Sequence, residues 1–300
     1  MLLYNFPEFL THELIKAKSM EKVGILGPRG THSEAAALRL NEILSFDREL
    51  VIFAEFYEIF SALEENKIDA GFVPVENSLE GSINITLDTL ARSNSLVIAR
   101  EFIWTIHNHL MAKLGVKISD VQKIFSHSQP ISQCRNYLQK NFPHAEIVVT
   151  TSTARAAEIV SESKISDGYA AICAERAGQI NNLVTLAAEV QDNAANRTRF
   201  FEIRRRKDFS ATKGDKVFII CQIAGSRAGS LCEVLKEFAF RHVNMTRIES
   251  RPARTELGEY IFFFDLENSV DRRTLNDAIG GVIRKSIWLK DLGTFPVISV

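Results

Sequence analysis

The sequence predicts an α/β protein in two parts, a large region of alternating strands and helices with a smaller α+β domain behind it. From Glu21 to about residue 200, short β-type runs alternate with stretches of helical periodicity, the pattern of βαβ units around a mostly parallel sheet. After Phe201 the composition shifts to a basic run and a short polar stretch. The remaining residues follow the order βαββαβ, which is the ferredoxin-like arrangement. At 300 residues the chain has the length of one large domain or two ordinary ones.

The predicted strands of the large region are short apolar runs that end at turn residues or polar clusters. They are Lys22–Leu26, Val51–Phe53, Ala70–Val75, Ser95–Ile106, His109–Met111, Lys123–Ser126, Glu146–Val149 and Tyr169–Cys173. A helix is expected to begin after Thr31, because Glu34 follows it at the spacing of a capping box. The other predicted helices carry apolar residues on one face. They are Tyr57–Asn66, Ile83–Ala91, Ser132–Lys140, Ala154–Ser161 and Ala174–Gly178.

The second part begins after a predicted linker, in which a basic run over 204–207 precedes a polar stretch over 210–214. Apolar residues at positions 231, 234, 235, 238 and 239 have the spacing of an amphipathic helix. A second helix is predicted over Arg272–Ile283. The predicted strands are Lys216–Ile223, Met245–Ser250, Glu259–Leu266 and Ile287–Phe295.

Composition and charge exclude several classes of protein. Hydrophobic residues make up 46% and charged residues 24%, as in globular proteins, which excludes a disordered or collagen-like chain. The 36 basic residues balance 37 acidic ones, and this argues against nucleic acid or a membrane surface as partner. We expect the 20 phenylalanines to fill the core. The cysteines Cys134, Cys173, Cys221 and Cys232 have neither zinc nor disulfide spacing, so we expect buried thiols and a cytoplasmic protein.

The N-terminal residues 1–21 are expected to form an extension without a targeting role. They contain Glu8 and Glu13 and lack both a basic start and an uninterrupted apolar stretch, unlike a secretory signal. The longest apolar runs of the chain, such as Val217–Cys221, are too short to cross a bilayer.

Five polar clusters lie where predicted strands end or helices begin, which is where open α/β sheets bind ligands. They are residues 30–33, 74–78, 126–133, 151–153 and 196–200. Any one cluster alone is better explained by ordinary helix capping. Together, their hydroxyls, amides and helix N-termini favour an anionic small molecule.

Motifs for cofactors are weak. Gly24, Gly27 and Gly30 lack the spacing of a dinucleotide-binding loop, and no Walker lysine motif is present. His107 and His109 lie two residues apart without an evident third metal ligand. We therefore expect neither an organic cofactor nor a metal.

Taken together, the clusters resemble the prephenate dehydratase family. Residues 27–33 (GPRGTHS), 73–81 (VPVENSLEG), 126–134 (SHSQPISQC) and 198–200 (TRF) look like motifs of its catalytic region. Residues 229–231 (GSL) and 248–252 (IESRP) are similar to the two signatures of its C-terminal ACT regulatory domain. The resemblance runs from about residue 22 to near the C-terminus. It departs from the family at His32, where an aromatic residue is usual, and at Ser128, where proline is usual.

The resemblance implies a division of the chain and a reaction. Residues 22–205 would form a catalytic domain of two lobes, similar to type 2 periplasmic binding proteins. Residues 206–214 would be a linker, and 215–300 the ACT domain. The implied activity is the conversion of prephenate to phenylpyruvate in phenylalanine biosynthesis, with loss of water and CO2 and without a cofactor.

This chemistry assigns roles to the motif residues. Prephenate is a dianion whose ring hydroxyl must leave, so a hydrogen bond or a proton must reach that oxygen. We place Thr198 at this hydroxyl and either Glu76 or His127 as the proton source. Asn77 is a further catalytic candidate, as a neutral donor to the substrate carboxylates. Arg199 suits a carboxylate, with an interdomain salt bridge as an equal alternative. The other predicted substrate-binding residues are Thr31, Ser33, Ser78, Gln129, Gln133, Ser152, Thr153 and Phe200. Helix capping is the alternative for Gln133, and core packing for Phe200.

The resemblance also implies that phenylalanine regulates the enzyme at the ACT domain. That domain would pair with a second chain across a two-fold axis, within a homodimer or homotetramer that also uses the catalytic domains. The candidate effector contacts are Gly229, Ser230, Leu231, Asn244, Glu249, Ser250, Arg251 and Pro252.

Two other functions stay open. The same fold could act on arogenate, the aminated form of prephenate, and give phenylalanine directly. The other open function is a non-catalytic amino-acid sensor, although such a sensor has no need of the segments 198–200 and 76–78.

Overall fold

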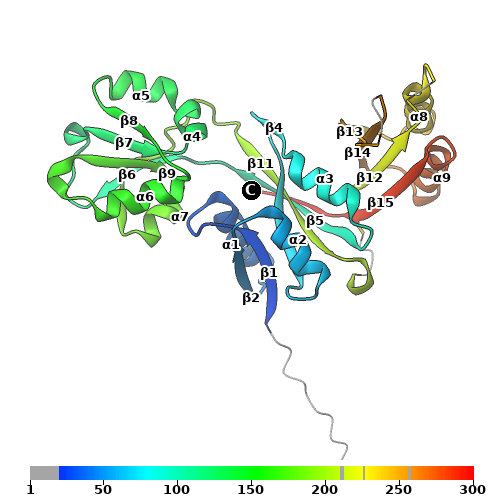
Figure 1. The fold of residues 1–300 in the computed structure, drawn as a ribbon, viewed down its shortest axis with the longest axis horizontal. Coiled ribbons are helices and arrows are strands. Elements are labelled where there is room, and N and C mark those ends of the chain that lie inside the picture. Colours follow the sequence, from blue (N-terminus) through cyan, green and yellow to red (C-terminus); the bar gives the residue numbers. More distant parts are fainter. Residues whose placement is uncertain (1–19, 210–212, 226, 256–257) are drawn as a thin grey trace, which may run out of the picture.

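The computed structural model describes residues 20–209, 213–225, 227–255 and 258–300. Two α/β lobes and a C-terminal domain lie in a row, with lobe 1 in the middle (Figure 1). Residues 1–19 of the predicted extension and 210–212 of the predicted linker lie outside the described residues. In the described ranges no helix combines the length and the apolarity that a bilayer crossing requires.

Lobe 1 is built on a mixed sheet with the strand order β16-β5-β11-β3-β1-β2, to which β4 adds beside β3. Its strands are β1 (Glu21–Leu26), β2 (Arg48–Phe53), β3 (Ala70–Asn77), β4 (Gly81–Ser82), β5 (Leu96–Thr105), β11 (Arg197–Arg205) and β16 (Val297–Ser299). Its helices are α1 (His32–Ile43), α2 (Phe56–Glu64) and α3 (Asn84–Arg92). Strand β1 pairs in parallel with both β2 and β3, which confirms the predicted βαβ units.

Lobe 2 is inserted between β5 and β11 and has its own sheet, in the order β10-β6-β9-β7-β8. Its strands are β6 (His109–Lys113), β7 (Lys123–Ser126), β8 (Glu146–Val149), β9 (Tyr169–Cys173) and β10 (Leu183–Ala187). Its helices are α4 (Ser128–Gln133), α5 (Arg135–Asn141), α6 (Thr153–Glu162) and α7 (Glu175–Ile180). The chain therefore crosses between the lobes twice, and the crossings are joined where Ile106 N–H donates to the Asn196 carbonyl at 2.9 Å. The predicted two-lobed α/β region is confirmed.

Strand β11 lies in the middle of the lobe 1 sheet, antiparallel to both β3 and β5, although the sequence did not predict a strand there. Its Glu202 is fully buried and forms ion pairs with Arg48 at 2.9 Å, Arg204 at 2.8 Å and Arg100 at 3.3 Å. These partners offset the cost of burying a carboxylate. A charged segment can therefore occupy a central position in the sheet.

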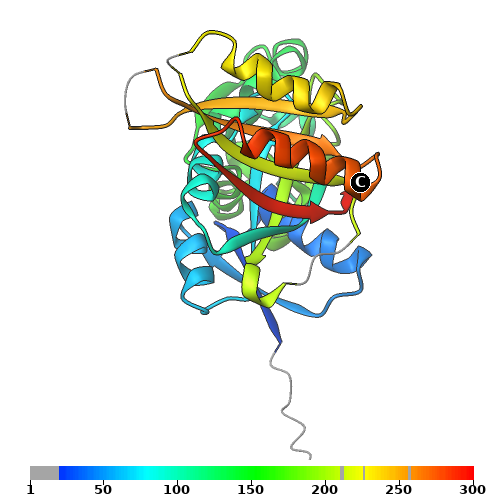
Figure 2. The same cartoon turned by 90° about the vertical axis from the view of Figure 1, so that its right-hand side faces the viewer.

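The C-terminal domain has the predicted order βαββαβ. Its strands are β12 (Lys216–Ile223), β13 (Met245–Pro252), β14 (Tyr260–Glu267) and β15 (Trp288–Phe295), and its helices are α8 (Ser230–Ala239) and α9 (Arg272–Ile283). The strand order β13-β14-β12-β15 is the ferredoxin-like one. Both helices cover the same face of the sheet (Figure 2).

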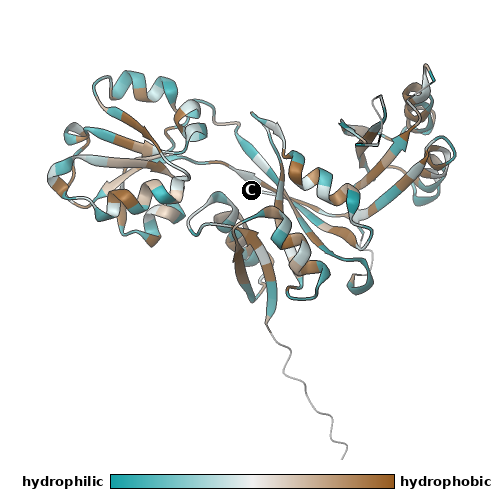
Figure 3. Ribbon diagram, in the orientation of Figure 1, coloured by the Kyte–Doolittle hydropathy of each residue, from teal (hydrophilic) through white to brown (hydrophobic). Residues whose placement is uncertain are grey.

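The other face of that sheet packs against lobe 1 in one shared apolar core (Figure 3). Phe218 and Phe295 of the C-terminal domain lie 5.4 and 5.6 Å from Phe201 of β11, measured between ring centroids. Burial of such rings is a strong favourable term. The expected role of phenylalanine in the core is confirmed, and the two parts form a continuous body.

The last residues of the chain leave the C-terminal domain and return to lobe 1. Val297–Ser299 pairs in parallel with β5, and Val300 N–H donates to the Ile103 carbonyl at 3.1 Å. The predicted domain range 215–300 is corrected at its end. The exposed edge of β5 can accept one more strand wherever the chain passes close to it.

The free cysteines follow the expectation in three cases of four. Cys134, Cys173 and Cys221 are buried, and burial raises the pKa of the Cys134 and Cys173 thiols to about 12. Cys232 is exposed on α8, so the expectation of burial is wrong there.

Candidate active site

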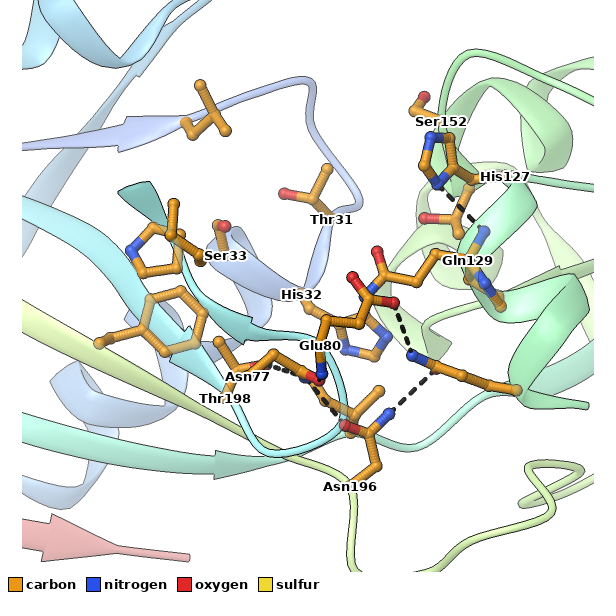
Figure 4. Close-up of a pocket in the computed structure, with 18 of the residues that line it drawn as sticks. Thr31, His32, Ser33, Asn77, Glu80, His127, Gln129, Ser152, Asn196 and Thr198 are labelled. Carbon is orange, nitrogen blue, oxygen red and sulfur yellow. Dashed lines mark hydrogen bonds between the residues drawn. The ribbon is translucent and has the colours of Figure 1, made fainter. Parts of the chain in front are cut away.

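A pocket of about 520 Å³ opens between lobe 1, lobe 2 and the two crossing segments (Figure 4). The predicted site residues that line it are Thr31, Ser33, Asn77, His127, Gln129, Gln133, Ser152, Thr153, Thr198 and Phe200. Leu26, Phe56, Pro74, Ile83 and Ile106 add an apolar wall. Segments that lie far apart in the sequence therefore form one site.

Three helices begin at the pocket wall. Thr31 caps α1 and Ser152 caps α6, each accepting a backbone N–H three residues on, at 3.4 and 3.0 Å. His127 caps α4, where its Nδ1 accepts the Gln129 N–H at 3.4 Å. Among the described residues that line the pocket none is lysine or arginine. Apart from Glu80 and the histidines, a bound anion would therefore meet helix N-termini and neutral donors, which stabilise negative charge through their partial charges.

Thr198 and Asn77 lie together on the lobe 1 side of the pocket, because the register of β3 and β11 places them opposite each other. Asn77 Nδ2 donates to Thr198 Oγ1 at 3.0 Å. The Asn77 Oδ1 accepts the backbone N–H groups of Leu79 and Glu80 at 3.0 and 3.2 Å, and this orients the amide. Since the Thr198 oxygen already accepts a hydrogen bond, its own hydrogen is available for donation to a ligand.

A chain of amides runs from Asn77 across to lobe 2 (Figure 4). Asn77 Nδ2 also donates to Asn196 Oδ1 at 2.9 Å. Asn196 and Asn108 both donate to Gln133 Oε1, at 3.0 and 3.3 Å. Gln133 Nε2 donates to Glu80 Oε1 at 3.5 Å. The Gln133 side chain, predicted to bind substrate, thus ties the two lobes together.

Six polar residues of the pocket were not predicted as site residues, namely His32, Glu80, Ser82, Asn108, Thr151 and Asn196. Glu80 and His32 lie inside family-like motifs, and Asn196 lies in a polar cluster next to one, so a closer look at the motifs could have found them. Asn108 carries no such signal, because only the crossing between lobes brings it to the pocket.

His32 lies on the pocket wall at the position where the family usually has an aromatic residue. Its Nδ1 accepts the Trp104 Nε1–H at 3.4 Å, and its Nε2 lies 3.5 Å from Asn108 Oδ1, which places the ring hydrogen on Nε2. Burial lowers the pKa of His32 to about 4, an effect that the Asn108 contact opposes and nearby histidines reinforce. The ring is therefore neutral at pH 7.

Replacing His32 with phenylalanine should make the protein less sensitive to acid. The unfolded chain binds a proton near pH 6.5, while the folded ring does so only near its pKa of about 4. As the pH falls through this window the unfolded state gains protons that the folded state does not, so stability present above pH ~6.5 is lost. Urea unfolding between pH 7 and 4 should show a smaller fall in free energy for His32→Phe than for the wild type. His144→Phe, at an exposed position, should follow the wild type. If the unfolding free energies of all three proteins fell equally with pH, the lowered pKa of His32 would be contradicted.

Glu76, Arg199 and Ser78, predicted for the site, do not line the pocket. Side chains alternate along a strand, so the neighbours of Asn77 and Thr198 face the opposite side of the sheet. There, Arg199 forms an ion pair with Glu76 at 2.6 Å. Ser78 donates to the Ala195 carbonyl at 3.2 Å and supports the loop. These three side chains therefore lie outside the pocket, and Arg199 forms the interdomain ion pair of the alternative.

Arg199 joins lobe 1 to the C-terminal domain. It bonds to Glu101 of β5 at 2.8 Å and to Asp265 of β14 at 2.9 Å, and both carboxylates are almost fully buried. Burial alone would lower the pKa of the Arg199 guanidinium, but the bonds and charges of Glu101 and Asp265 outweigh it and raise the pKa. The charge on Arg199 is thus a permanent part of the interface.

The predicted effector contacts divide between two faces of β13. Glu249 and Arg251 face lobe 1, where Arg251 pairs with Asp88 of α3 at 3.1 Å. Ser250 and Pro252 are exposed. Gly229, Ser230 and Leu231 start α8, and Asn244 directly precedes β13. Gly229 has φ +83°, and no heavy atom lies within 4 Å of where a Cβ would stand, so a ligand could approach the backbone there.

Comparisons with known proteins agree with this architecture. A sequence model described as "Prephenate dehydratase" matches residues 23–208. The prephenate dehydratase of Methanocaldococcus jannaschii is 34% identical over 271 residues, which cover 90% of this chain and 96% of that protein. The structure of prephenate dehydratase from Arthrobacter aurescens in complex with L-Phe aligns with a TM-score of 0.82 and 32% identity, over 92% of this chain and 89% of that one. The structure of prephenate dehydratase from Staphylococcus aureus aligns with a TM-score of 0.78 and 27% identity, over 92% of this chain and 100% of that one.

Proposed function

Because the chain belongs to the prephenate dehydratase family, we propose that the pocket between its lobes is where prephenate becomes phenylpyruvate. The observation that carries this proposal is the Thr198–Asn77 pair, whose free hydroxyl hydrogen can reach a ligand in the pocket. As a member of an enzyme family the protein is a hydro-lyase, so the sensor considered from the sequence is set aside.

The reaction breaks two bonds of the prephenate ring. The bond between the ring and its carboxylate breaks, CO2 leaves, and the electron pair completes the aromatic ring. The hydroxyl at the opposite ring carbon departs and takes up one proton to become water. Thr198 donates a hydrogen bond to this departing oxygen, where negative charge develops in the transition state. Asn77 holds Thr198 in that orientation.

The remaining roles follow from the two walls of the pocket. The carboxylates of the substrate bind at the N-termini of α1 and α6, through Thr31, Ser33, Ser152 and Thr153. Since Glu76 faces away, His127 is the proposed proton donor of the two predicted. Histidine is the side chain that most often serves as a general acid, and the His127 imidazole lies on the pocket wall.

Arogenate is a second candidate substrate because of Glu80. This carboxylate lines the pocket near Gln133 and could pair with the ammonium group that distinguishes arogenate from prephenate. Both substrates therefore belong in the first assay.

We also propose regulation and assembly through the C-terminal domain. Phenylalanine would bind beside β13 and the start of α8, at the exposed face that includes Ser230 and Ser250. Strand β13 is an edge strand of its sheet, which supports pairing with a second chain in a homodimer or homotetramer. The free thiols of the described cysteines support a cytoplasmic location.

Phenylpyruvate formation from prephenate, followed by absorbance with and without phenylalanine, tests the proposal. We expect turnover that phenylalanine suppresses, and a lower kcat in the variant His127→Gln. His144→Gln, at an exposed histidine, is the matched control and should retain wild-type kcat. Turnover of arogenate but not of prephenate would identify arogenate as the substrate of this pocket. No turnover of either compound would refute the proposed function.

A further inference from the structure

Ser82 lies between the pocket and the C-terminal domain. The residue lines the pocket, and its strand β4 pairs with β3 next to Asn77. On its other side the Ser82 hydroxyl donates to Glu249 Oε2 at 2.7 Å and accepts from the Arg247 guanidinium at 2.5 Å. A single pocket residue is thus held by two side chains of β13.

Strand β13 has contacts on both of its faces. Arg247, Glu249 and Arg251 are partly buried and contact lobe 1, whereas Ile248 and Ser250 between them are exposed on the proposed effector side. This division follows from the alternation of side chains along a strand. A displacement of β13 on its effector side is therefore transmitted to the pocket wall without intermediate residues.

The contacts of β13 with β14 are not fully satisfied. Arg247 Nη1 and Asp265 Oδ1 are buried and have no hydrogen-bond partner among the described residues. Arg247 Nη1 lies 4.0 Å from Asp265 Oδ2, the oxygen that already accepts from Arg199. Buried polar atoms are normally paired, so a small shift of β13 that brings Arg247 Nη1 within hydrogen-bond distance of the Asp265 carboxylate would give this nitrogen a partner. The strand thus has a second arrangement within reach, as a switching element requires.

We propose that Ser82 is a positioning residue for the dehydratase reaction, held in place by Glu249 and Arg247 of the C-terminal domain. Movement of β13 shifts Ser82 and the adjacent Gly81, which pairs with Asn77, and so changes the placement of the Thr198–Asn77 pair. The proposal rests on the proposed function, since it names how phenylalanine binding would reach the pocket.

The test separates binding of phenylalanine from its effect. Turnover of prephenate is measured with and without saturating phenylalanine, and binding is measured by calorimetry, for the wild type, Glu249→Ala and Glu249→Gln. Glutamine keeps an oxygen acceptor for the Ser82 hydroxyl, whereas alanine does not. Glu267→Ala, on the last residue of β14, is the matched control.

We expect phenylalanine to lower wild-type turnover about tenfold or more, in the range of allosteric couplings. In Glu249→Ala the ratio of turnover without phenylalanine to turnover with phenylalanine should fall close to one, while calorimetry still detects phenylalanine binding. Glu249→Gln and Glu267→Ala should remain close to the wild type. Unchanged inhibition in Glu249→Ala overturns the proposal, and so does loss of binding, which would make Glu249 an effector ligand. A wild type that phenylalanine does not inhibit overturns the proposed regulation itself, before any variant is made.

Discussion

Replacing Thr198 with valine should lower kcat about 10²–10³-fold and leave KM much less affected. Valine keeps the shape of the side chain, which is 8% exposed, but it cannot donate a hydrogen bond to the departing hydroxyl. The interaction strengthens as charge develops on that oxygen, so its loss acts on the transition state more than on the bound substrate. Single donors of this kind are worth about 10²–10³-fold in kcat.

Steady-state kinetics of phenylpyruvate formation measures both constants. Thr198→Ser keeps the hydroxyl and should recover most of the rate. Thr185→Val, on β10 of lobe 2 and outside the pocket, controls for the change from threonine to valine. Calorimetry should show phenylalanine binding intact in all three variants. A Thr198→Val enzyme within a few-fold of the wild type would remove Thr198 from the chemistry.

Replacing Arg199 with methionine should destabilise the protein by about 3–5 kcal/mol. The substitution leaves Glu101 and Asp265 buried with fewer partners, and an uncompensated buried charge costs about that much. Lys216, which lies 3.2 Å from Glu101, remains as a partner of that carboxylate and reduces the loss. Because the cluster joins lobe 1 to the C-terminal domain, we expect both to unfold together.

Urea unfolding measures this loss of free energy. The control is Arg39→Met, where the ion pair with Glu42 is exposed on α1 and should be worth about 0–1 kcal/mol. The same experiment decides between the two roles considered for Arg199. A stable Arg199→Met protein with a greatly raised KM would mean that the guanidinium binds substrate after all.

Local sequence patterns predicted most of the helices and the strand order of the C-terminal domain. The helix starts at Thr31 and Ser152 follow from capping residues that need only their own neighbours in the chain. Apolar periodicity likewise predicts α8 and α9, and the order βαββαβ follows from them. Motif residues that lie at helix N-termini reached the pocket as expected, because a βαβ fold brings these ends to one side of each sheet.

Strand β11 could not be predicted as a central strand, because Glu202 and Arg204 are charged and their suitability for burial depends on Arg48 and Arg100, which lie far away in the sequence. The pairing of Val297–Ser299 with β5 could not be predicted either, since an open strand edge is a property of the assembled sheet.

The sequence by itself determined which residue types are present and where helices begin. It thereby determined the set of candidate residues for the site. The tertiary structure decided which of them face the pocket. Asn77 and Thr198 point into it while Glu76 and Arg199, one position away, form the interface with the C-terminal domain. The physical reason is that side chains alternate along a strand, and only the packing of domains determines which face becomes a pocket and which becomes an interface.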